Sequence, residues 1–396
     1  MLAICSDLDE TPDRNVYGQI MRFLNTNQTT AMGPGVGLEV GNSIYFDMPP
    51  GQFSYWNTDD AGREMIRALI RSGHIDCLHS YGDLAATRAH AGRALDELDR
   101  RGCRLEVWVD HGVAATNFGD DIMCGHGDEP GHEAYHADLT TGHGVRYVWR
   151  GRVTSVTGQD VRPRFGGLFS AAHPLASGRT LAREVAKHVL ARSGSGKYAM
   201  HGPNELMRPV ALRDGRGAYE FMRCNPHWGG LGSCDRGSRI GSVLTADALD
   251  RLVDRQGTCV LYTHLGKIED PQRPFGPSAV EGFRRLAGLH RQGKLLVTTT
   301  RRLLGFHRAL RELSFTVERR DGNVRVDLST IGRDSMDGLG SLPQTDLAGL
   351  TFYVPQPERT RVFVDGRQAD PISNAPDHTH RPSVSLPWHA LEFPQL

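Results

Sequence analysis

The chain has 396 residues, and its 46 lysine and arginine residues balance 46 aspartate and glutamate residues, so the formal net charge is zero. This length suffices for a complete hydrophobic core and for more than one domain. The balanced charge argues against a protein that bulk electrostatics holds on nucleic acid or on an anionic membrane.

Short apolar segments alternate with amphipathic helices along the first 300 residues. Strands are predicted at 2–5, 37–46, 77–81, 104–112, 145–151, 259–264 and 294–300. Helices are predicted at 61–73, 84–101, 180–193, 246–256 and 279–292. This alternation is typical of βαβ units and a parallel sheet. Four of the strands end in acidic residues or histidine, as strands do at the active-site end of an α/β barrel, and we therefore expect a barrel.

The pattern changes after residue 311. The segment SFTVERRDGNVRVDLST, which begins at Ser314, alternates apolar and polar residues around an Asp-Gly turn and predicts a β-hairpin. Later segments such as TRVFVDGRQ continue in the same style. We expect an α/β domain at 1–311, with an insertion around 152–243, and a small antiparallel, sandwich-like accessory domain at 312–396.

Residues that could take part in catalysis or metal binding lie at or just after the carboxyl ends of two predicted strands, 2–5 and 77–81. Asp7 and Asp9 follow the first apolar strand, and two carboxylates this close suit one metal ligand and one general base, or else a helix cap and a solvated aspartate. His79 ends a later strand, four residues before Asp83. Imidazole and carboxylate both bind zinc and other divalent ions, although a single histidine at a strand end is as often structural.

Three further histidines stand out. His111 follows Asp110 at the end of a strand rich in valine, and a polar pair in that place indicates a binding site. His136 belongs to a histidine-rich segment that we expect to cover the site. His264 ends the strand VLYTH, where it would serve as a general acid or bind substrate.

This order of motifs resembles the polysaccharide deacetylases of carbohydrate esterase family 4, which share a distorted (β/α) barrel. SDLDE is similar to the first motif of that family, GHIDCLHSYGD to the second and VLYTH to the last, and the resemblance covers about residues 1–310. In this chain Leu8 separates two acids that are adjacent in the family. Asp83 replaces the second metal histidine, and His111 stands where the family usually carries an Arg-Pro motif.

The resemblance implies particular roles for these residues. Asp7 would be the base and His264 the acid that protonates the leaving amine. Asp9 and His79, with Asp83 or His111, would hold a divalent metal ion, with zinc as the expected metal.

The resemblance also implies a reaction. We expect a metal-dependent hydrolase that removes an acyl group from an N-acetylated sugar or a related amide, in surface-glycan or secondary-metabolite biosynthesis. Tyr81, Asp110, His136 and Trp228 are the candidate substrate contacts. The rings of Tyr81 and Trp228 can stack on sugars, or else they belong to the core.

Two other functions stay open. One is a metal-independent glycoside hydrolase or other carbohydrate-active barrel enzyme that uses a carboxylate pair such as Asp9 and Asp110. The other is a carbohydrate-binding protein without catalytic activity. The sequence is compatible with a homo-oligomer.

The sequence also predicts where the protein resides. No run approaches the roughly 18 apolar residues that a membrane span needs. The amino-terminal segment lacks the basic region of a signal peptide, and the seven cysteines include no C-x-x-C pair, so reduced thiols are expected. We therefore expect a cytoplasmic protein with no membrane span and no nucleic-acid partner.

Overall fold

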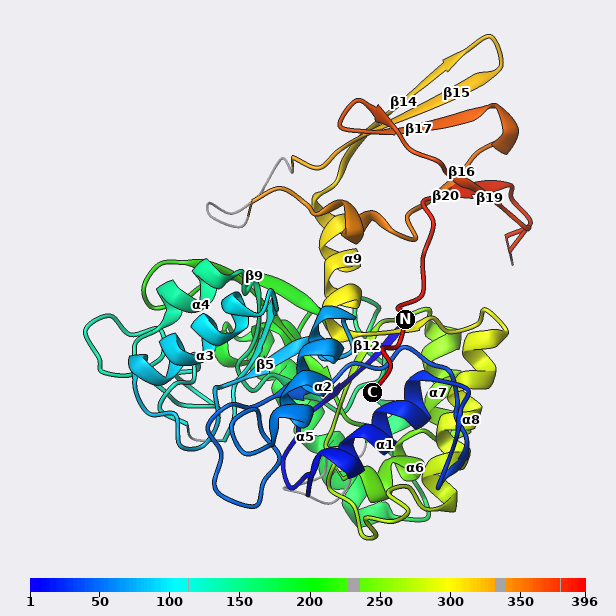
Figure 1. Cartoon of the computed structure of the whole chain (residues 1–396). Coiled ribbons are helices and arrows are strands. Elements are labelled where there is room, and N and C mark those ends of the chain that lie inside the picture. The colour runs from blue at the N-terminus through cyan, green and yellow to red at the C-terminus, as the bar shows by residue number, and fades with distance from the viewer. Residues whose placement is uncertain (113, 227–235, 332–339, 378) are drawn as a thin grey trace. The chain divides into compact units, whose positions relative to one another are not determined.

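The computed structural model describes residues 1–112, 114–226, 236–331, 340–377 and 379–396 (Figure 1). The described residues form two compact units. The larger consists of Met1–Arg301 with Leu391–Leu396, and the smaller of Arg302–Ala390. The larger unit combines helices with parallel strands, which confirms the predicted mixed α/β class. None of the described helices combines the length and the apolar character that a membrane crossing requires.

The first sheet of the larger unit is parallel throughout its described strands. Its strand order is β13-β1-β12-β11-β8, with bounds Val297–Thr298, Leu2–Ser6, Cys259–Thr263, Arg223–Cys224 and Val153–Thr154. Every residue of β1 and β12 is buried, as expected for parallel strands that are covered on both faces. Ser6 pairs with Thr263, so the residues that follow these two strands leave the sheet at the same edge.

The second sheet has six strands and is parallel except at one edge. Its order is β4-β5-β6-β7-β10-β9, with bounds Ser43–Ile44, Cys77–His79, Val107–Val109, Tyr147–Trp149, Gly217–Phe221 and Met207–Ala211. The edge strand β9 pairs antiparallel with β10. His79 pairs with Val109, and Val109 with Trp149, so these strands end at one level. Closure of the two sheets into one barrel stays a prediction.

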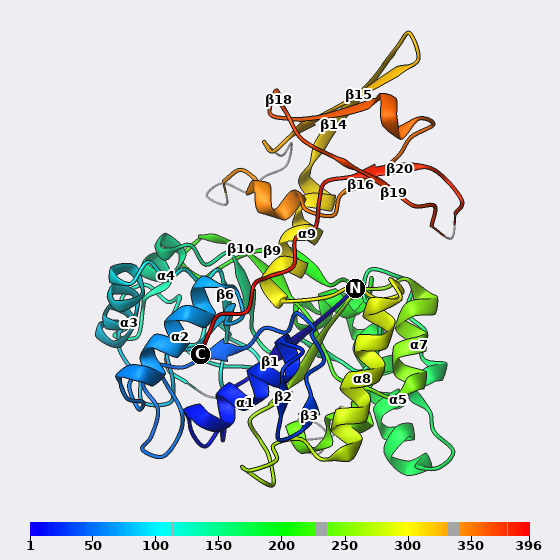
Figure 2. The ribbon, with the colours of Figure 1, turned by 45° about the vertical axis from the view of Figure 1, so that its right-hand side comes forward.

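Helices and short elements connect these strands. Among the described residues the α-helices are α1 (Arg14–Asn25), α2 (Asp60–Arg71), α3 (Arg88–Arg100), α4 (Ala137–His143), α5 (Pro174–Arg192), α6 (Ile240–Val243), α7 (Ala246–Arg255) and α8 (Pro277–Arg291). A further helix, α9 (Thr300–Glu312), follows the last of these strands, and most of it belongs to the smaller unit. The 3₁₀ turns are η1 (Gly166–Leu168), η2 (Gly196–His201) and η3 (Gly237–Arg239), and β2 (Thr29–Thr30) pairs with β3 (Gly33–Pro34). Figures 1 and 2 both place α7 and α8 side by side.

The helix ends follow from local chemistry. The Asp13 side chain accepts hydrogen bonds from the backbone N–H groups of Asn15 and Val16, and so caps the start of α1. A different helix, α7, ends at Gln256, which adopts the left-handed conformation (φ 53°) common at the carboxyl ends of helices.

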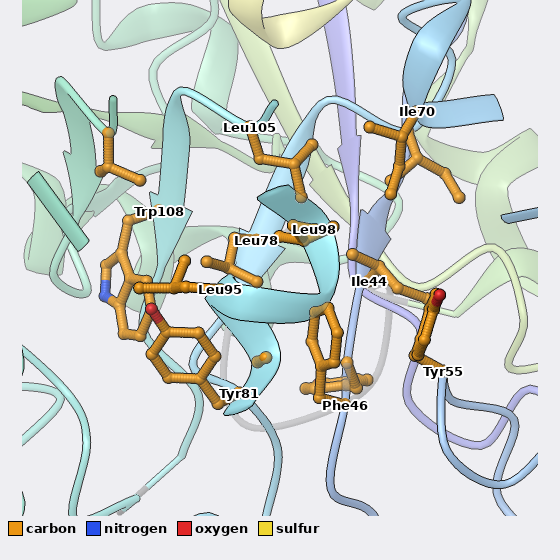
Figure 3. Packing of buried hydrophobic residues seen from close by; sticks show 14 of the residues in the cluster. Ile44, Phe46, Tyr55, Ile70, Leu78, Tyr81, Leu95, Leu98, Leu105 and Trp108 are labelled. Carbon is orange, nitrogen blue, oxygen red and sulfur yellow. The ribbon is translucent and has the colours of Figure 1, made fainter. Parts of the chain in front are cut away.

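Two hydrophobic clusters hold the larger unit together. In the first, the strand residues Ile44, Leu78 and Trp108 pack against helix residues such as Ile70 of α2 and Leu95 of α3 (Figure 3). The second cluster joins the apolar residues of β1 and β12 to those of α1, α7 and α8. These clusters place the helices on the sheets and thereby fix where each strand ends.

We expect Leu78→Ala to lower the free energy of unfolding by about 2–5 kcal/mol, because it opens a cavity at a fully buried position between β4 and β6. Chemical denaturation followed by circular dichroism measures the change. Leu175 on α5 is 89% exposed and serves as the control, and Leu175→Ala should change the value by no more than about 0.5 kcal/mol. Equal effects of the two substitutions would contradict the packing.

The smaller unit contains two sheets. The first has the order β14-β15-β17-β18, with bounds Ser314–Arg320, Asn323–Ser329, Thr360–Val364 and Arg367–Gln368. The second has the order β16-β20-β19, with bounds Thr351–Tyr353, Ser383–Ser385 and Ile372–Asn374, and the 3₁₀ turns are η4 (Gln344–Leu347) and η5 (Pro357–Arg359). Asp321 and Gly322 both have positive φ in the β14–β15 turn, as a type I′ hairpin requires.

The strand pairing of the smaller unit differs from the expected one. The second sheet is antiparallel, but β15 and β17 of the first sheet pair parallel. The predicted small antiparallel domain is therefore not confirmed. Alternating polarity indicates strands and hairpins, whereas the direction in which distant strands pair depends on long-range packing.

Candidate functional site

Polar residues at the carboxyl ends of four parallel strands line one cavity of about 720 Å³. Strand β1 contributes two of them, β6 contributes two, and β5 and β12 contribute one each. They are Asp7, Asp9, His79, Asp110, His111 and His264. Within each sheet parallel strands share a carboxyl edge, and the edges of both sheets line this cavity, so residues that are up to 257 positions apart in the chain meet there.

Asp9, His79 and His111 bring one ligand atom each to within 4.8 Å of one another. The Nδ1 atom of His79 lies 2.9 Å from the carbonyl oxygen of Val109, to which it donates a hydrogen bond. The Nε2 atom of the neutral ring therefore keeps its lone pair. This buried nitrogen makes no hydrogen bond among the described residues, although it lies 3.5 Å from Oδ2 of Asp7. A buried polar atom without a partner is costly, and a cation would satisfy it.

Asp83 contacts this group through His111. The Nε2 atom of His111 lies 2.9 Å from Oδ1 of Asp83, and its Nδ1 atom lies 3.6 Å from Oδ1 of Asp9. Asp83 thus accepts the Nε2 proton, and Nδ1 is the His111 nitrogen on the side of Asp9 and of the Tyr45 hydroxyl. Burial lowers the pKa of His111, but the hydrogen bond to Asp83 and the charge of Asp9 raise it more, so the net shift is upward.

Tyr45, which directly follows β4, is a site residue that the sequence did not single out. Its hydroxyl hydrogen-bonds to the Asp9 carboxylate and lies 2.7 Å from Nδ1 of His111. Its ring stacks on His79, with the ring centroids 4.5 Å apart. Burial and the charge of Asp9 raise the pKa of Tyr45 well above its usual value, so the phenol stays a hydrogen-bond donor. Its position at the end of a strand, like that of His79, was the available signal.

Asp7 is held by a buried arginine. Nη1 and Nη2 of Arg223 lie 2.7 and 3.0 Å from Oδ1 and Oδ2 of Asp7. The guanidinium carbon lies 3.5 Å from the ring centroid of Trp149 and 4.2 Å from that of Tyr262. Burial raises the pKa of Asp7, but the charges of Arg223 and His79 outweigh it and hold the pKa well below its usual range. Asp7 is therefore ionised at neutral pH.

His264 lies beside both acids. Its Nε2 atom is 3.1 Å from Oδ2 of Asp9 and 3.9 Å from Oδ2 of Asp7. Nζ of Lys267 is 3.6 Å from the same Asp9 oxygen. Burial raises the pKa of Asp9, but the hydrogen bond and the charge of His264 lower it more, so this carboxyl is also ionised.

Asp110 lines the cavity, but its carboxylate is engaged by neighbouring groups. Its Oδ1 accepts hydrogen bonds from Nε1 of Trp108 and the backbone N–H of Phe118, at 2.7 and 2.9 Å, and its Oδ2 accepts one from Gly119 at 2.9 Å. Burial raises the pKa of Asp110 to about 7, although the hydrogen bond from Phe118 lowers it.

Two of the proposed substrate contacts lie outside the described lining of the cavity. Tyr81 is fully buried, and its hydroxyl lies 2.6 Å from Oγ1 of Thr140. His136 is also buried, with Nδ1 and Nε2 each 2.8 Å from an oxygen, on Thr140 and Thr116 respectively. Trp228, the remaining proposed contact, lies outside the described residues.

The chain matches no protein-family model, no curated protein and no solved structure. The resemblance to polysaccharide deacetylases therefore stays a prediction that depends on its three short motifs. Any functional proposal draws its support from the geometry of the cavity.

Proposed function

We propose that this protein is a metal-dependent amide hydrolase of the polysaccharide deacetylase type, which removes an acyl group from an N-acetylated sugar or a related amide. The convergence of Asp9, His79 and His111 on one point of the cavity carries the proposal. Two imidazoles and one carboxylate form a ligand set that leaves a zinc ion an open position for water or substrate. The fold that this proposal implies is a distorted (β/α) barrel.

The donor atoms fit such an ion. Nε2 of His79 makes no hydrogen bond among the described residues, and the contact of Asp83 with Nε2 of His111 leaves Nδ1 on the side of Asp9. These two nitrogens and the Asp9 carboxylate would hold the metal. When bound, a divalent ion polarises the substrate carbonyl and lowers the pKa of a water molecule in its coordination sphere.

The remaining steps belong to the side chains around the metal ligands. Asp7 accepts a proton from the attacking water, and Arg223 keeps the carboxylate ionised and oriented. The water oxygen joins the acyl carbon, and the bond from that carbon to the amide nitrogen breaks. His264, which lies near both acids, gives a proton to the departing amine. The products are a carboxylic acid and a free amine.

The rival glycoside hydrolase would use a carboxylate pair such as Asp9 and Asp110. The grouping of His79 and His111 with Asp9 favours the metal-dependent reaction, because a mechanism with two carboxylates alone assigns these imidazoles no role. A cytoplasmic location, which the sequence predicts, favours a nucleotide-linked or small soluble sugar over a polymer as the substrate.

Release of acetate from N-acetylated amino sugars tests the proposal. We expect His264→Gln to lower kcat by about 100- to 10,000-fold, because a general acid contributes that much to the rate, while the metal content stays unchanged. His126→Gln is the control, since His126 lies outside the described lining of the cavity and pairs with Glu129. No acetate from metal-loaded wild-type protein with any sugar tested would overturn the proposal in favour of a binding protein.

A further inference from the structure

Lysine is rare in this chain, and most of it lies at one cavity. Only four of the 46 basic residues are lysines, at positions 187, 197, 267 and 294. Three of these four line the cavity that contains Asp9, whereas Lys294 is exposed in the loop after α8. The overall composition does not explain why lysines gather at this cavity, because apart from Lys294 all the remaining lysine and arginine positions are arginine. An ammonium group is a compact charge that binds a phosphate or carboxylate as a point charge.

The cavity lysines belong to two groups. Lys267 is part of the acidic site, with Nζ 3.6 Å from Asp9 Oδ2 and 3.7 Å from Glu10 Oε1. Lys187 and Lys197 come instead from α5 and η2. Arg183 lies four residues before Lys187, hence on the same side of α5, and it also lines the cavity. We call Arg183, Lys187 and Lys197 the cationic wall.

The two lysines of this wall differ in how their charges are compensated. Nζ of Lys187 lies 2.8 Å from Oε1 of the buried Glu184, so that charge is neutralised. Nζ of Lys197 donates to the carbonyl oxygen of Asp121 at 3.2 Å, and the described residues place no carboxylate in an ion pair with it. A cavity-lining ammonium with only a neutral acceptor is suited to an anionic group on a ligand.

We propose that the substrate is an N-acetylated sugar that carries an anionic group, a phosphate or a carboxylate, and that Lys197 and Arg183 bind this group. This inference rests on the proposed function in one respect only, namely that the acyl group of the substrate lies toward Asp9. A cavity of about 720 Å³ can hold a ligand of drug-like size, which is larger than one acetamido group. Tyr198, next to Lys197, adds an aromatic ring to the lining, and such a ring can pack against a sugar.

Isothermal titration calorimetry on the zinc-loaded full chain carrying His264→Gln, which is expected to keep the metal and to slow turnover, tests this inference with three probes. They are N-acetylglucosamine, N-acetylglucosamine 1-phosphate and N-acetylglucosaminuronic acid. We expect at least one anionic sugar to bind about 10- to 100-fold more tightly than the neutral sugar, as expected for a hydrogen bond to a charged group. Preference for the phosphate or for the uronate identifies the source of the charge.

Lys197→Gln keeps a hydrogen-bond donor and removes the charge. It should weaken binding of the preferred anionic sugar about tenfold or more and leave the neutral sugar unchanged. Arg183→Gln should act in the same direction, and it serves as the second variant if the first fails to fold. Lys294→Gln, at the lysine outside the cavity, should change neither affinity.

Two results would overturn the inference: no preference for either anionic sugar, or equal weakening of neutral and anionic sugars by Lys197→Gln. Because binding is measured without turnover, the two proposals fail separately. Tight binding of an anionic sugar without acetate release would overturn the hydrolase and keep the cationic wall. Acetate release from all sugars without an anion preference would do the reverse.

Discussion

His79→Ala is expected to reduce the metal content of the purified protein from about one divalent ion per chain to nearly none. The side chain is 1% exposed, and its Nε2 atom, which has no hydrogen-bond partner among the described residues, lies beside Asp9 and His111. Removing it leaves one imidazole and one carboxylate, too few to hold zinc firmly. Inductively coupled plasma mass spectrometry on tag-free protein, after reconstitution with zinc, measures the content.

Two further variants make this measurement specific. His126→Ala should keep the full metal content, because His126 lies outside the described lining of the cavity. Asp83→Ala should keep the metal but weaken its affinity about 10- to 100-fold, as loss of a carboxylate that orients a ligand histidine does. Complete loss of metal in Asp83→Ala would make Asp83 a ligand. A wild-type protein that takes up no metal would contradict the proposed mechanism.

Arg223→Met is expected to lower the free energy of unfolding at pH 7 by about 3–5 kcal/mol. The Arg223 side chain is fully buried and that of Asp7 is 4% exposed, so the substitution leaves an ionised carboxylate in the core without its partner. It also removes the cation between Trp149 and Tyr262. Chemical denaturation monitored by circular dichroism gives the change.

The double variant Asp7→Asn/Arg223→Met is the matched test, because it removes both charges and should recover part of the lost stability. Arg100→Met, at a side chain that is 68% exposed, should cost no more than about 0.5 kcal/mol. If Arg223→Met lowers the free energy of unfolding no more than Arg100→Met does, the result would contradict the buried ion pair.

The same pair predicts a pH dependence. The pKa of Asp7 is lower in the folded than in the unfolded state, so the unfolded chain binds the proton first as the pH falls. The stabilisation by the pair is therefore complete above a pH of about 4, the unfolded pKa, and declines below it. Denaturation curves between pH 7 and 3 should show a smaller decline in the double variant than in the wild type.

Sequence reasoning placed five chemical groups at strand ends, and the structure brings all five to one cavity. They are Asp7, Asp9, His79, His111 and His264. Apolar periodicity marks each strand and its end, and parallel strands within one sheet share a carboxyl edge, so this much could be predicted. That the edges of both sheets line the same cavity was decided by the tertiary structure. The mixed α/β class followed from the same local signals.

Other features of the site depend on contacts between distant segments. Arg223 lies in a region that the sequence left as an insertion, and only the pairing of β11 with β12 brings it to Asp7. The sequence left Asp83 and His111 as alternative ligands, and the hydrogen bond between them puts His111 nearer to Asp9. Spacing along the chain gives neither of these distances.

The direction of a side chain also needed the tertiary structure. Tyr81 and His136 were expected at the substrate, but both turn into the core, where Thr140 contacts each of them. The chain alone determined which residues end strands and carry chemistry, because that information is local. The tertiary structure decided which of them meet, since strand order, side-chain rotamer and the pairing of buried charges result from packing across the whole unit.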